Sequence, residues 1–298
     1  MSPQCIMVTG ATGFLGSHLV KSLLAAGHEV VAVKRSTSSM ERLNKVADRV
    51  TLVDADRADF DRVFSTPPHI NGVLHTATSY GRKGEREADV REANTGFPTR
   101  LLKAAIDAGV PLFINVDTPL PAATSLYAET KKAFLATAQR MCKGSATRLI
   151  NVPMEQVYGP GDDDSKFTSY VIGGCADDVE SLALTAGEQR RDFIYIDDAV
   201  AALMLLIEQR GGTRADFCEY GLGMGEAITI REFCERVKQI TGAATTLDFG
   251  ALPYRGNEVM ESCADIGPLE KLGWRWRVDL DTGIANTAET YARQEKAS

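Results

Sequence analysis

The sequence predicts an α/β fold, in which a doubly wound parallel sheet is joined to a smaller C-terminal part. Through the first half of the chain, short apolar runs rich in β-branched residues alternate with helical patterns, and the connections are short. A glycine-rich turn separates the first apolar run from the first helical pattern. After about residue 158 the segments become shorter and less regular, which indicates that a second part begins there.

The first 33 residues form a complete βαβ pattern. Residues 5–8 and 30–33 are strand-like, and residues 15–24 form an amphipathic helix. Three glycines at a G-x-x-G-x-x-G spacing lie between strand and helix, where a tight turn and the close approach of a phosphate both need residues without a Cβ atom. The free N–H groups of the helix start favour an anion. The pattern therefore predicts a Rossmann-type dinucleotide site rather than a purely structural turn. Its candidate contacts are Gly10, Thr12, Gly13, Phe14, Leu15 and Gly16.

The remaining elements extend this unit into a sheet whose ligand edge lies at the carboxyl ends of the strands. We expect strands at residues 50–53, 72–75, 112–116, 148–152 and 192–196, and helices at 95–108, 127–141, 197–208 and 230–241. Residues 1–157, with 190–212 returning to them, are expected to form the dinucleotide-binding domain. Residues 158–189 and 213–298 are expected to form a substrate-binding cap over the ligand edge.

The composition is that of an ordinary globular protein: 44% of the 298 residues are hydrophobic and 24% are charged. A net charge of −7 argues against a general nucleic-acid binder. Six scattered cysteines without a C-x-x-C pair indicate neither a zinc site nor a redox motif, and they suit a reducing compartment. No apolar stretch is long enough to cross a membrane, so the expected location is cytoplasmic. The acidic turn at residues 162–164 is expected to be a solvated turn or a rim of the substrate pocket, and to hold no metal.

A second motif places a tyrosine and a lysine one helical turn apart, at Tyr127 and Lys131. An ammonium group near a phenol favours the phenolate, so we expect Lys131 to lower the pKa of Tyr127. Such a tyrosine can exchange a proton with a carbonyl or alcohol oxygen. Thr118, at the carboxyl end of the preceding strand, could present a hydroxyl to the same oxygen, and the less favoured alternative is a turn residue ahead of Pro119.

With glycine loop, hydroxyl and Tyr-x-x-x-Lys in this order, the chain resembles the extended short-chain dehydrogenase/reductase family, of the NAD-dependent epimerase/dehydratase type. The resemblance extends to Tyr158-Gly159-Pro160-Gly161, to the segment 189–198 and to Leu272-Gly273-Trp274. It implies catalytic roles for Thr118, Tyr127 and Lys131, of which Lys131 would also bind the nicotinamide ribose. It implies further cofactor contacts at Asp56, Arg57, His75, Ala77 and Asn94, and substrate contacts at Thr78, Ser79, Glu155, Gln156, Arg191 and Arg255. An ion pair with Asp192 or Asp197 is the alternative for Arg191.

Departures from the family pattern refine this interpretation. Many NAD-dependent relatives carry an acid after the second strand, whereas this chain has Lys34, Arg35 and Ser36, which favours NADP(H) over NAD(H) because the bases would pair with a 2′-phosphate. The alternative is a solvated basic turn. Pro119-Leu120 replaces the Asp-Glu of sugar dehydratases, which argues against dehydration. Pro153 stands where many relatives have arginine. Short segments, including residues 159–167, resemble CDP-abequose/paratose synthase-type 4-ketoreductases.

The resemblance therefore implies an NADPH-dependent reductase of a nucleotide-linked 4-keto-deoxysugar, with Tyr127 as proton donor. The alternatives are a nucleotide-sugar 4-epimerase with tightly bound NAD(P), and an NADP-sensing binding protein without activity. Family members commonly pair through the helices that correspond to residues 95–108 and 127–141. Both are apolar beyond one stripe, which predicts a homodimer unless the chain itself covers both faces.

Overall fold

The computed structural model describes residues 3–82, 84–209 and 215–295. The chain divides into two compact units. The first comprises Met1–Pro153 with Val200–Tyr220, and the second comprises Met154–Ala199 with Gly221–Ser298. These limits differ from the predicted domains, because residues 154–157 and 190–199 belong to the second unit and residues 215–220 to the first. The predicted boundary at residues 212 and 213 lies outside the described residues.

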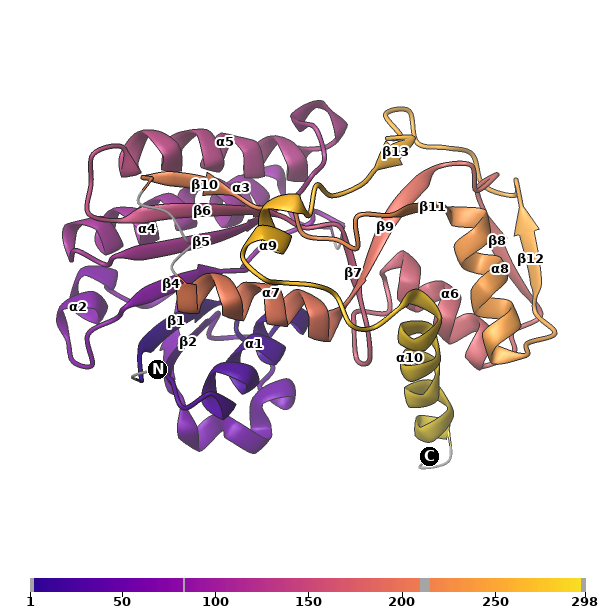
Figure 1. Ribbon diagram of the computed structural model, residues 1–298, viewed down its shortest axis with the longest axis horizontal. Coiled ribbons are helices and arrows are strands. Elements are labelled where there is room, and N and C mark those ends of the chain that lie inside the picture. Colours follow the sequence, from indigo (N-terminus) through magenta and orange to yellow (C-terminus); the bar gives the residue numbers. More distant parts are fainter. Residues whose placement is uncertain (1–2, 83, 210–214, 296–298) are drawn as a thin grey trace. The chain divides into compact units, whose positions relative to one another are not determined.

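The first unit contains a seven-stranded parallel sheet in the order β10-β6-β5-β4-β1-β2-β3 (Figure 1). β1 lies between β2 and β4, so the strand order reverses beside the turn that follows β1. This switch point is where open α/β sheets bind ligands. The strands are β1 (Cys5–Thr9), β2 (Glu29–Lys34), β3 (Thr51–Asp54), β4 (Gly72–His75), β5 (Leu112–Asp117), β6 (Arg148–Pro153) and β10 (Phe217–Glu219).

Helices cover both faces of this sheet, as Figure 1 shows for α4 and α5 on one side and α1 on the other. The central strands are apolar and buried on both faces, as expected of a parallel sheet. The helices of this unit are α1 (Phe14–Ala25), α2 (Phe60–Ser65), α3 (Glu87–Arg91), α4 (Phe97–Asp107), α5 (Leu126–Cys142) and the part of α7 (Ile196–Gln209) that begins at Val200. Short 3₁₀ helices form at Glu41–Arg49 and Ala122–Thr124.

The sequence patterns predict six of the seven strands to within one residue at each end. The pattern misses β10, because three residues are too few to show a period. The predicted helix at 95–108 is part of a longer one, since α3 continues through a π-helical turn, Glu92–Gly96, into α4. Such single π turns often occur at functional sites.

The apolar residues of α4 and α5 belong mainly to the core of this unit. Leu101, Leu102 and Phe134 are buried, and Ile106 and Leu135 pack against them. The expectation of a second apolar face on these helices is therefore wrong for the large side chains. Exposed apolar positions of the predicted second face remain only at the small residues Ala133 and Ala136.

The second unit combines two small sheets with four helices. β9 pairs with β7, β11 and β13, whereas β8 pairs with β12. Phe193 stacks on Phe233 with ring centroids 4.2 Å apart, and Tyr158 packs beside them. The elements are β7 (Gln156–Tyr158), α6 (Phe167–Ala176), β8 (Ser181–Leu184), β9 (Arg190–Tyr195), β11 (Ala227–Thr229), α8 (Ile230–Thr241), β12 (Thr246–Phe249), β13 (Glu261–Ser262), α9 (Gly267–Lys271) and α10 (Leu280–Glu295). Within the described residues, every helix is too short or too polar to cross a bilayer.

Candidate active site

The glycine turn between β1 and α1 is built by close backbone contacts. Gly10 has a φ of +64°, and a Cβ atom there would lie 2.9 Å from the backbone of Ala77. A Cβ atom on Gly16 would lie 2.1 Å from the carbonyl oxygen of Gly10. Glycine is therefore required at both positions. Gly13, which precedes α1, is exposed and leaves the helix start without a side-chain cap. The turn fits the phosphate cradle of a dinucleotide.

The other predicted loop residues differ in what they can offer a ligand. Thr12 is partly exposed, so its hydroxyl is accessible. Phe14 and Leu15 are buried, and their side chains face the protein interior. Any contact they make with a phosphate would therefore use their backbone N–H groups.

The ends of β2 and β3 hold the residues predicted to read the adenosine part of the cofactor. Lys34 donates to Asp54 Oδ1 over 2.7 Å, and only 11% of its side chain is exposed. Ser36 donates from its backbone N and its hydroxyl to the Asp56 carboxylate, over 2.7 and 2.6 Å, and these bonds lower the pKa of Asp56 to about 2. The structure thus leaves Arg35 and Arg57 exposed, whereas Lys34 is already paired.

The end of β4 is joined to β1 by a buried histidine. His75 Nδ1 lies 2.8 Å from Thr9 Oγ1, which in turn accepts from the backbone N of Ala77. The His75 ring is fully buried beside Phe113 and Phe134, and burial lowers its pKa. His75 is a predicted cofactor contact, and because its ring is buried such a contact would use its backbone. The ring instead helps to hold Ala77 against the glycine turn.

Asn94, in the π-helical turn, clamps the loop after β4 to helix α5. Its Oδ1 accepts from the Thr78 hydroxyl and from the Ser79 backbone N, over 3.1 and 2.8 Å. Its Nδ2 donates to the Ser79 carbonyl and to the Thr130 hydroxyl, over 2.8 and 3.0 Å. Both amide hydrogens and both oxygen lone pairs are therefore used within the protein. Asn94 fixes the loop that carries Thr78 and Ser79, and it has no capacity left for a cofactor.

The predicted catalytic residues come together in the first unit, at the end of β5 and the start of α5. Thr118 is buried, and it lies close enough to Tyr127 to affect the pKa of the phenol. Lys131 is buried, and its Nζ donates to the Val116 carbonyl oxygen over 2.7 Å. Burial lowers the pKa of Lys131 to about 8.

The expectation that Lys131 lowers the pKa of Tyr127 is wrong for this state of the protein. Burial raises the pKa of the Tyr127 phenol well above its ordinary value, and the neighbouring Tyr80 and Asp117 raise it further. The hydrogen bond with Thr118 and the charge of Arg82 lower it by less. Tyr127 is therefore a neutral phenol at physiological pH, which suits a proton donor.

Sequence reasoning missed four neighbours of this centre. Tyr80, which is 44% exposed, lies against Tyr127 with ring centroids 4.9 Å apart, and the Arg82 guanidinium lies 5.5 Å from the Tyr80 ring centre. Asp117 and Lys132 form a 2.8 Å ion pair directly beside Thr118. The sequence signal that could have identified the ion pair was a charged residue at the end of a predicted strand, Asp117, and another in the predicted helix that follows it, Lys132.

The second unit contains the other predicted substrate residues. Arg191 pairs with Glu258 over 2.6 Å, so its partner is neither Asp192 nor Asp197. Arg255 is exposed and near enough to lower the pKa of Arg191, which burial lowers first. Both oxygens of buried Glu155 lie within hydrogen-bond distance of the Ser262 hydroxyl, at 2.7 and 2.9 Å. Burial raises the pKa of Glu155 to about 7.

Two remaining features of the site have structural explanations. Gln156 is exposed at the start of β7. The Asp192 carboxylate accepts from the backbone N atoms of Met224, Gly225 and Ala264, so it stabilises the loops of the second unit. In the acidic turn, Asp162 pairs with Lys166 over 2.9 Å. No group of three metal-binding side chains occurs among the described residues.

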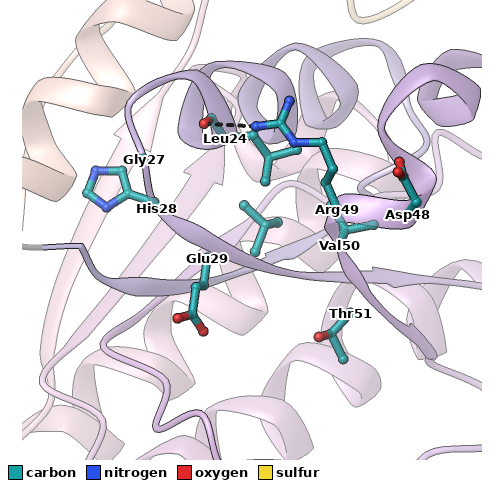
Figure 2. Close-up of a pocket in the computed structure, with 9 residues that line it drawn as sticks. Leu24, Gly27, His28, Glu29, Asp48, Arg49, Val50 and Thr51 are labelled. Atoms are coloured by element: carbon teal, nitrogen blue, oxygen red, sulfur yellow. Dashed lines mark hydrogen bonds between the residues drawn. The ribbon is translucent and has the colours of Figure 1, made fainter.

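A surface depression on the first unit lies at the amino ends of the strands, opposite to the end at which the glycine turn lies. Figure 2 shows the residues that line it. Its lining includes Glu29 and Thr51, the first residues of β2 and β3, whereas the glycine turn follows the last residue of β1. Arg49 crosses the depression and donates to the Leu24 carbonyl oxygen over 3.3 Å (Figure 2). The depression is therefore separate from the candidate active site.

The strand order and the glycine turn at the switch point define a dinucleotide-binding α/β protein of the Rossmann type. The chain belongs to the NAD dependent epimerase/dehydratase family, whose sequence model matches residues 6–217.

Named relatives support an enzyme of nucleotide-sugar metabolism. The chain is 30% identical to CDP-abequose synthase of Salmonella typhimurium, over 94% of this chain and 96% of the relative. It is 29% identical to dTDP-4-dehydro-6-deoxy-D-allose reductase of Streptomyces bikiniensis, over 80% and 82%. The crystal structure of UDP-glucuronic acid 4-epimerase from Bacillus cereus, in complex with UDP-glucuronic acid and NAD, superimposes with a TM-score of 0.83 at 22% identity, over 98% of this chain and 100% of that one. The chain is therefore an NAD(P)-dependent oxidoreductase, with relatives that support reductase or epimerase-type activity on a nucleotide sugar.

Proposed function

We propose that the protein is an NADPH-dependent reductase of a nucleotide-linked 4-keto-deoxysugar, in which C4 of the sugar receives a hydride and its oxygen receives a proton from Tyr127. The observation that carries the proposal is the neutral phenol of Tyr127, which lies one helical turn before buried Lys131 and close enough to Thr118 for that residue to affect its pKa, in the same unit as the glycine cradle. Reduction of a carbonyl needs a proton donor, whereas oxidation of an alcohol needs a base.

Each catalytic residue of the first unit has a separate role in the proposed reduction. Bound NADPH supplies the hydride. Thr118 orients the carbonyl oxygen through its hydroxyl, and Tyr127 gives that oxygen its proton, so that the ketone becomes an alcohol and the phenol becomes a phenolate that solvent reprotonates. Lys131 is proposed to bind the nicotinamide ribose with the ammonium hydrogens that Val116 does not accept.

The second unit is proposed to be the substrate-binding domain. Arg191 and Arg255 are neighbouring cations, and together they suit the two phosphates of a nucleotide sugar. Glu155 and Gln156 are proposed to contribute to the same binding surface. Thr78 and Ser79, in the first unit, are proposed to contact the sugar, because Asn94 fixes their loop beside α5.

The proposed cofactor preference rests on the end of β2. Arg35 is exposed there, and no acidic side chain occupies the positions from 34 to 36. An arginine pairs well with a phosphate, so we propose that NADP(H) binds more tightly than NAD(H).

A 4-epimerase is the second candidate function, because UDP-glucuronic acid 4-epimerase shares this fold. An NADP-sensing binding protein is a weaker alternative, because the chain retains both Tyr127 and Lys131. The described cysteines are free thiols, which supports the proposal of a reducing, cytoplasmic location. A homodimer is also proposed, from the resemblance alone.

The discriminating experiment measures NADPH absorbance with a panel of 4-keto-6-deoxysugars linked to CDP, dTDP, GDP and UDP. A reductase consumes one NADPH for each alcohol formed. An epimerase interconverts two sugars with no net consumption, and a sensor binds NADPH without turnover. Failure of every keto-sugar to oxidise NADPH, in a protein that binds NADPH, would contradict the proposed reduction.

A further inference from the structure

A cluster of polar side chains lies under the site on one face of the sheet. Asp117 ends β5 with its side chain fully buried, and its Oδ2 accepts from Lys132 Nζ over 2.8 Å and from Asn151 Nδ2 over 3.2 Å. Asn115 donates to Asn151 Oδ1 over 2.7 Å, and Asn151 also donates to Glu219 Oε2 over 2.8 Å. Adjacent strands bring these residues together, since Asn115 pairs with Asn151 and Asn151 with Glu219.

The composition of this cluster is not explained by stability alone. Buried ion pairs contribute little to folding, because the desolvation of both charges offsets their attraction. Asp117 Oδ1 is buried and has no hydrogen-bond partner in the described part of the chain. An apolar pair between β5 and α5, like the neighbouring Phe113 and Phe134, would avoid that cost.

The ion pair does, however, connect the two elements that carry the reacting groups. Lys132 Nζ lies between the Asp117 carboxylate and the Thr118 carbonyl oxygen, which accepts from it over 2.5 Å. Lys132 belongs to α5, the helix in which Tyr127 is the second residue. Thr118 belongs to the loop after β5. A single ammonium group thus fixes the backbone of Thr118 to the helix of Tyr127.

We propose that Asp117 and Lys132 are a positioning pair, which holds Thr118 and α5 so that the Thr118 hydroxyl and the Tyr127 phenol meet the same substrate oxygen. The proposal rests on the proposed reduction, in which both groups act on one carbonyl. Neither Asp117 nor Lys132 is proposed to touch the substrate. A misplacement of about 1 Å in such a pair can cost ~100-fold in rate.

The carboxylate has a second effect that makes the pair observable. Asp117 raises the pKa of Tyr127, together with burial and Tyr80, against the smaller effects of Thr118 and Arg82. Removal of the Asp117 charge should therefore lower the pKa of the phenol. Removal of the Lys132 charge leaves the carboxylate unpaired and should raise it.

The experiment uses NMR of the full-length protein with ¹³C at the ζ carbon of tyrosine, and Tyr127→Phe assigns the Tyr127 signal. The variants are Asp117→Asn, which keeps the shape of the side chain, and Lys132→Met, which keeps its length. Lys103→Met is the matched control, because Lys103 pairs with Asp107 on the exposed surface of α4. NADPH dissociation constants and kcat are measured for each protein.

We expect the two site variants to move the Tyr127 signal in opposite directions, and to lower kcat at least tenfold while the NADPH dissociation constant stays within twofold. The control should change neither. Lys132→Arg keeps the charge and should retain the signal and most of kcat. Lys132→Gln, which also removes the charge, replaces Lys132→Met if that variant fails to fold. An unmoved Tyr127 signal in both site variants, or an unchanged kcat in an active enzyme, overturns the proposal. If the unsubstituted protein reduces no keto-sugar, the proposed reduction fails, and the NMR result still decides whether the pair positions Tyr127.

Discussion

At the scale of single residues, the protonation state of Tyr127 favours one direction of proton transfer. The phenol lies near Tyr80, Thr118 and the Asp117 carboxylate, and the positive charge of Arg82 lowers its pKa. A neutral phenol can give its proton to a forming alkoxide, and the phenolate that results takes a proton from solvent. An epimerase needs the same tyrosine as a base in its first step, so a neutral phenol suits the proposed reduction.

Replacement of Tyr127 by phenylalanine removes the proton donor and little else. The ring and its contact with Tyr80 remain, so we expect the fold and NADPH binding to persist. Turnover of a keto-sugar should fall at least ~100-fold, the usual scale of a general acid. NADPH fluorescence titration and steady-state kinetics measure the two quantities. Near-normal turnover would remove Tyr127 from the mechanism.

Two neighbouring cations at the end of β2 should behave differently. Arg35→Ala should weaken NADPH more than NADH, because only NADPH carries the 2′-phosphate and the Arg35 side chain is exposed. Lys34→Met should affect both cofactors alike, because Lys34 is already paired with Asp54 between β2 and β3. Dissociation constants of both variants for both cofactors provide the comparison. Equal losses for NADPH and NADH in Arg35→Ala would show that Arg35 does not contact that phosphate.

At the scale of elements, the cofactor turn depends on how closely three segments of backbone approach one another. Gly16→Ala should abolish dinucleotide binding, since the new Cβ atom would lie 2.1 Å from the Gly10 carbonyl oxygen. Gly72→Ala in β4 is the control, because its Cβ atom would meet side chains at ordinary distances of 3.5 Å or more. NADPH titration and circular dichroism of both variants test this. If a folded Gly16→Ala protein still binds NADPH, the glycine turn is not the phosphate-binding site.

The sequence predicts the elements of the first unit well because their signals are local. A strand such as β5 shows its apolar run, and the glycine turn shows its spacing within a few residues. The contacts made by polar side chains are different, because they depend on tertiary packing. Nothing in the sequence shows that Lys34 pairs with Asp54, or that Lys131 donates to the Val116 carbonyl oxygen. Nor does it show that the Asn94 amide forms its hydrogen bonds within the protein. Burial likewise reversed the expected shift in the pKa of Tyr127.

At the scale of the whole molecule, one buried acid should make stability depend on pH. The pKa of Glu155 is raised from 4.5 to about 7, so the folded state holds a proton that the unfolded state has lost. Stability from this group should therefore fall as pH rises from about 4.5 to 7, and the full penalty should persist above pH 7. It amounts to as much as about 3 kcal/mol at 1.36 kcal/mol per pKa unit.

Glu155→Gln removes that titration and keeps an acceptor for Ser262. The difference in Tm between the variant and the unsubstituted protein should grow in favour of the variant between pH 5 and 8. Thermal unfolding at several pH values, in one buffer system of constant ionic strength, measures it. A difference that does not change with pH would show that Glu155 is already ionised at pH 5.

The last prediction at this scale concerns the assembly state, and the structure changes the reason for expecting a dimer. The large apolar residues of α4 and α5 are covered within the first unit. A two-fold dimer through these helices would therefore meet at small residues, Ala133 and Ala136, flanked by charged side chains such as Glu129. Small residues allow two helices to approach closely, so the family's mode of pairing remains our prediction.

Light scattering at micromolar concentration should then report twice the 32.3 kDa of one chain. Ala133→Arg with Ala136→Arg should convert the protein to a monomer, because two buried arginines would face their own copies across the two-fold axis. Both sites are exposed in the single chain, so the substitutions should leave its fold intact, and circular dichroism checks this. Because Tyr127 lies near the start of α5, the monomeric variant should also have lower kcat. A 32.3 kDa species for the unsubstituted protein would instead show that α5 is complete without a partner.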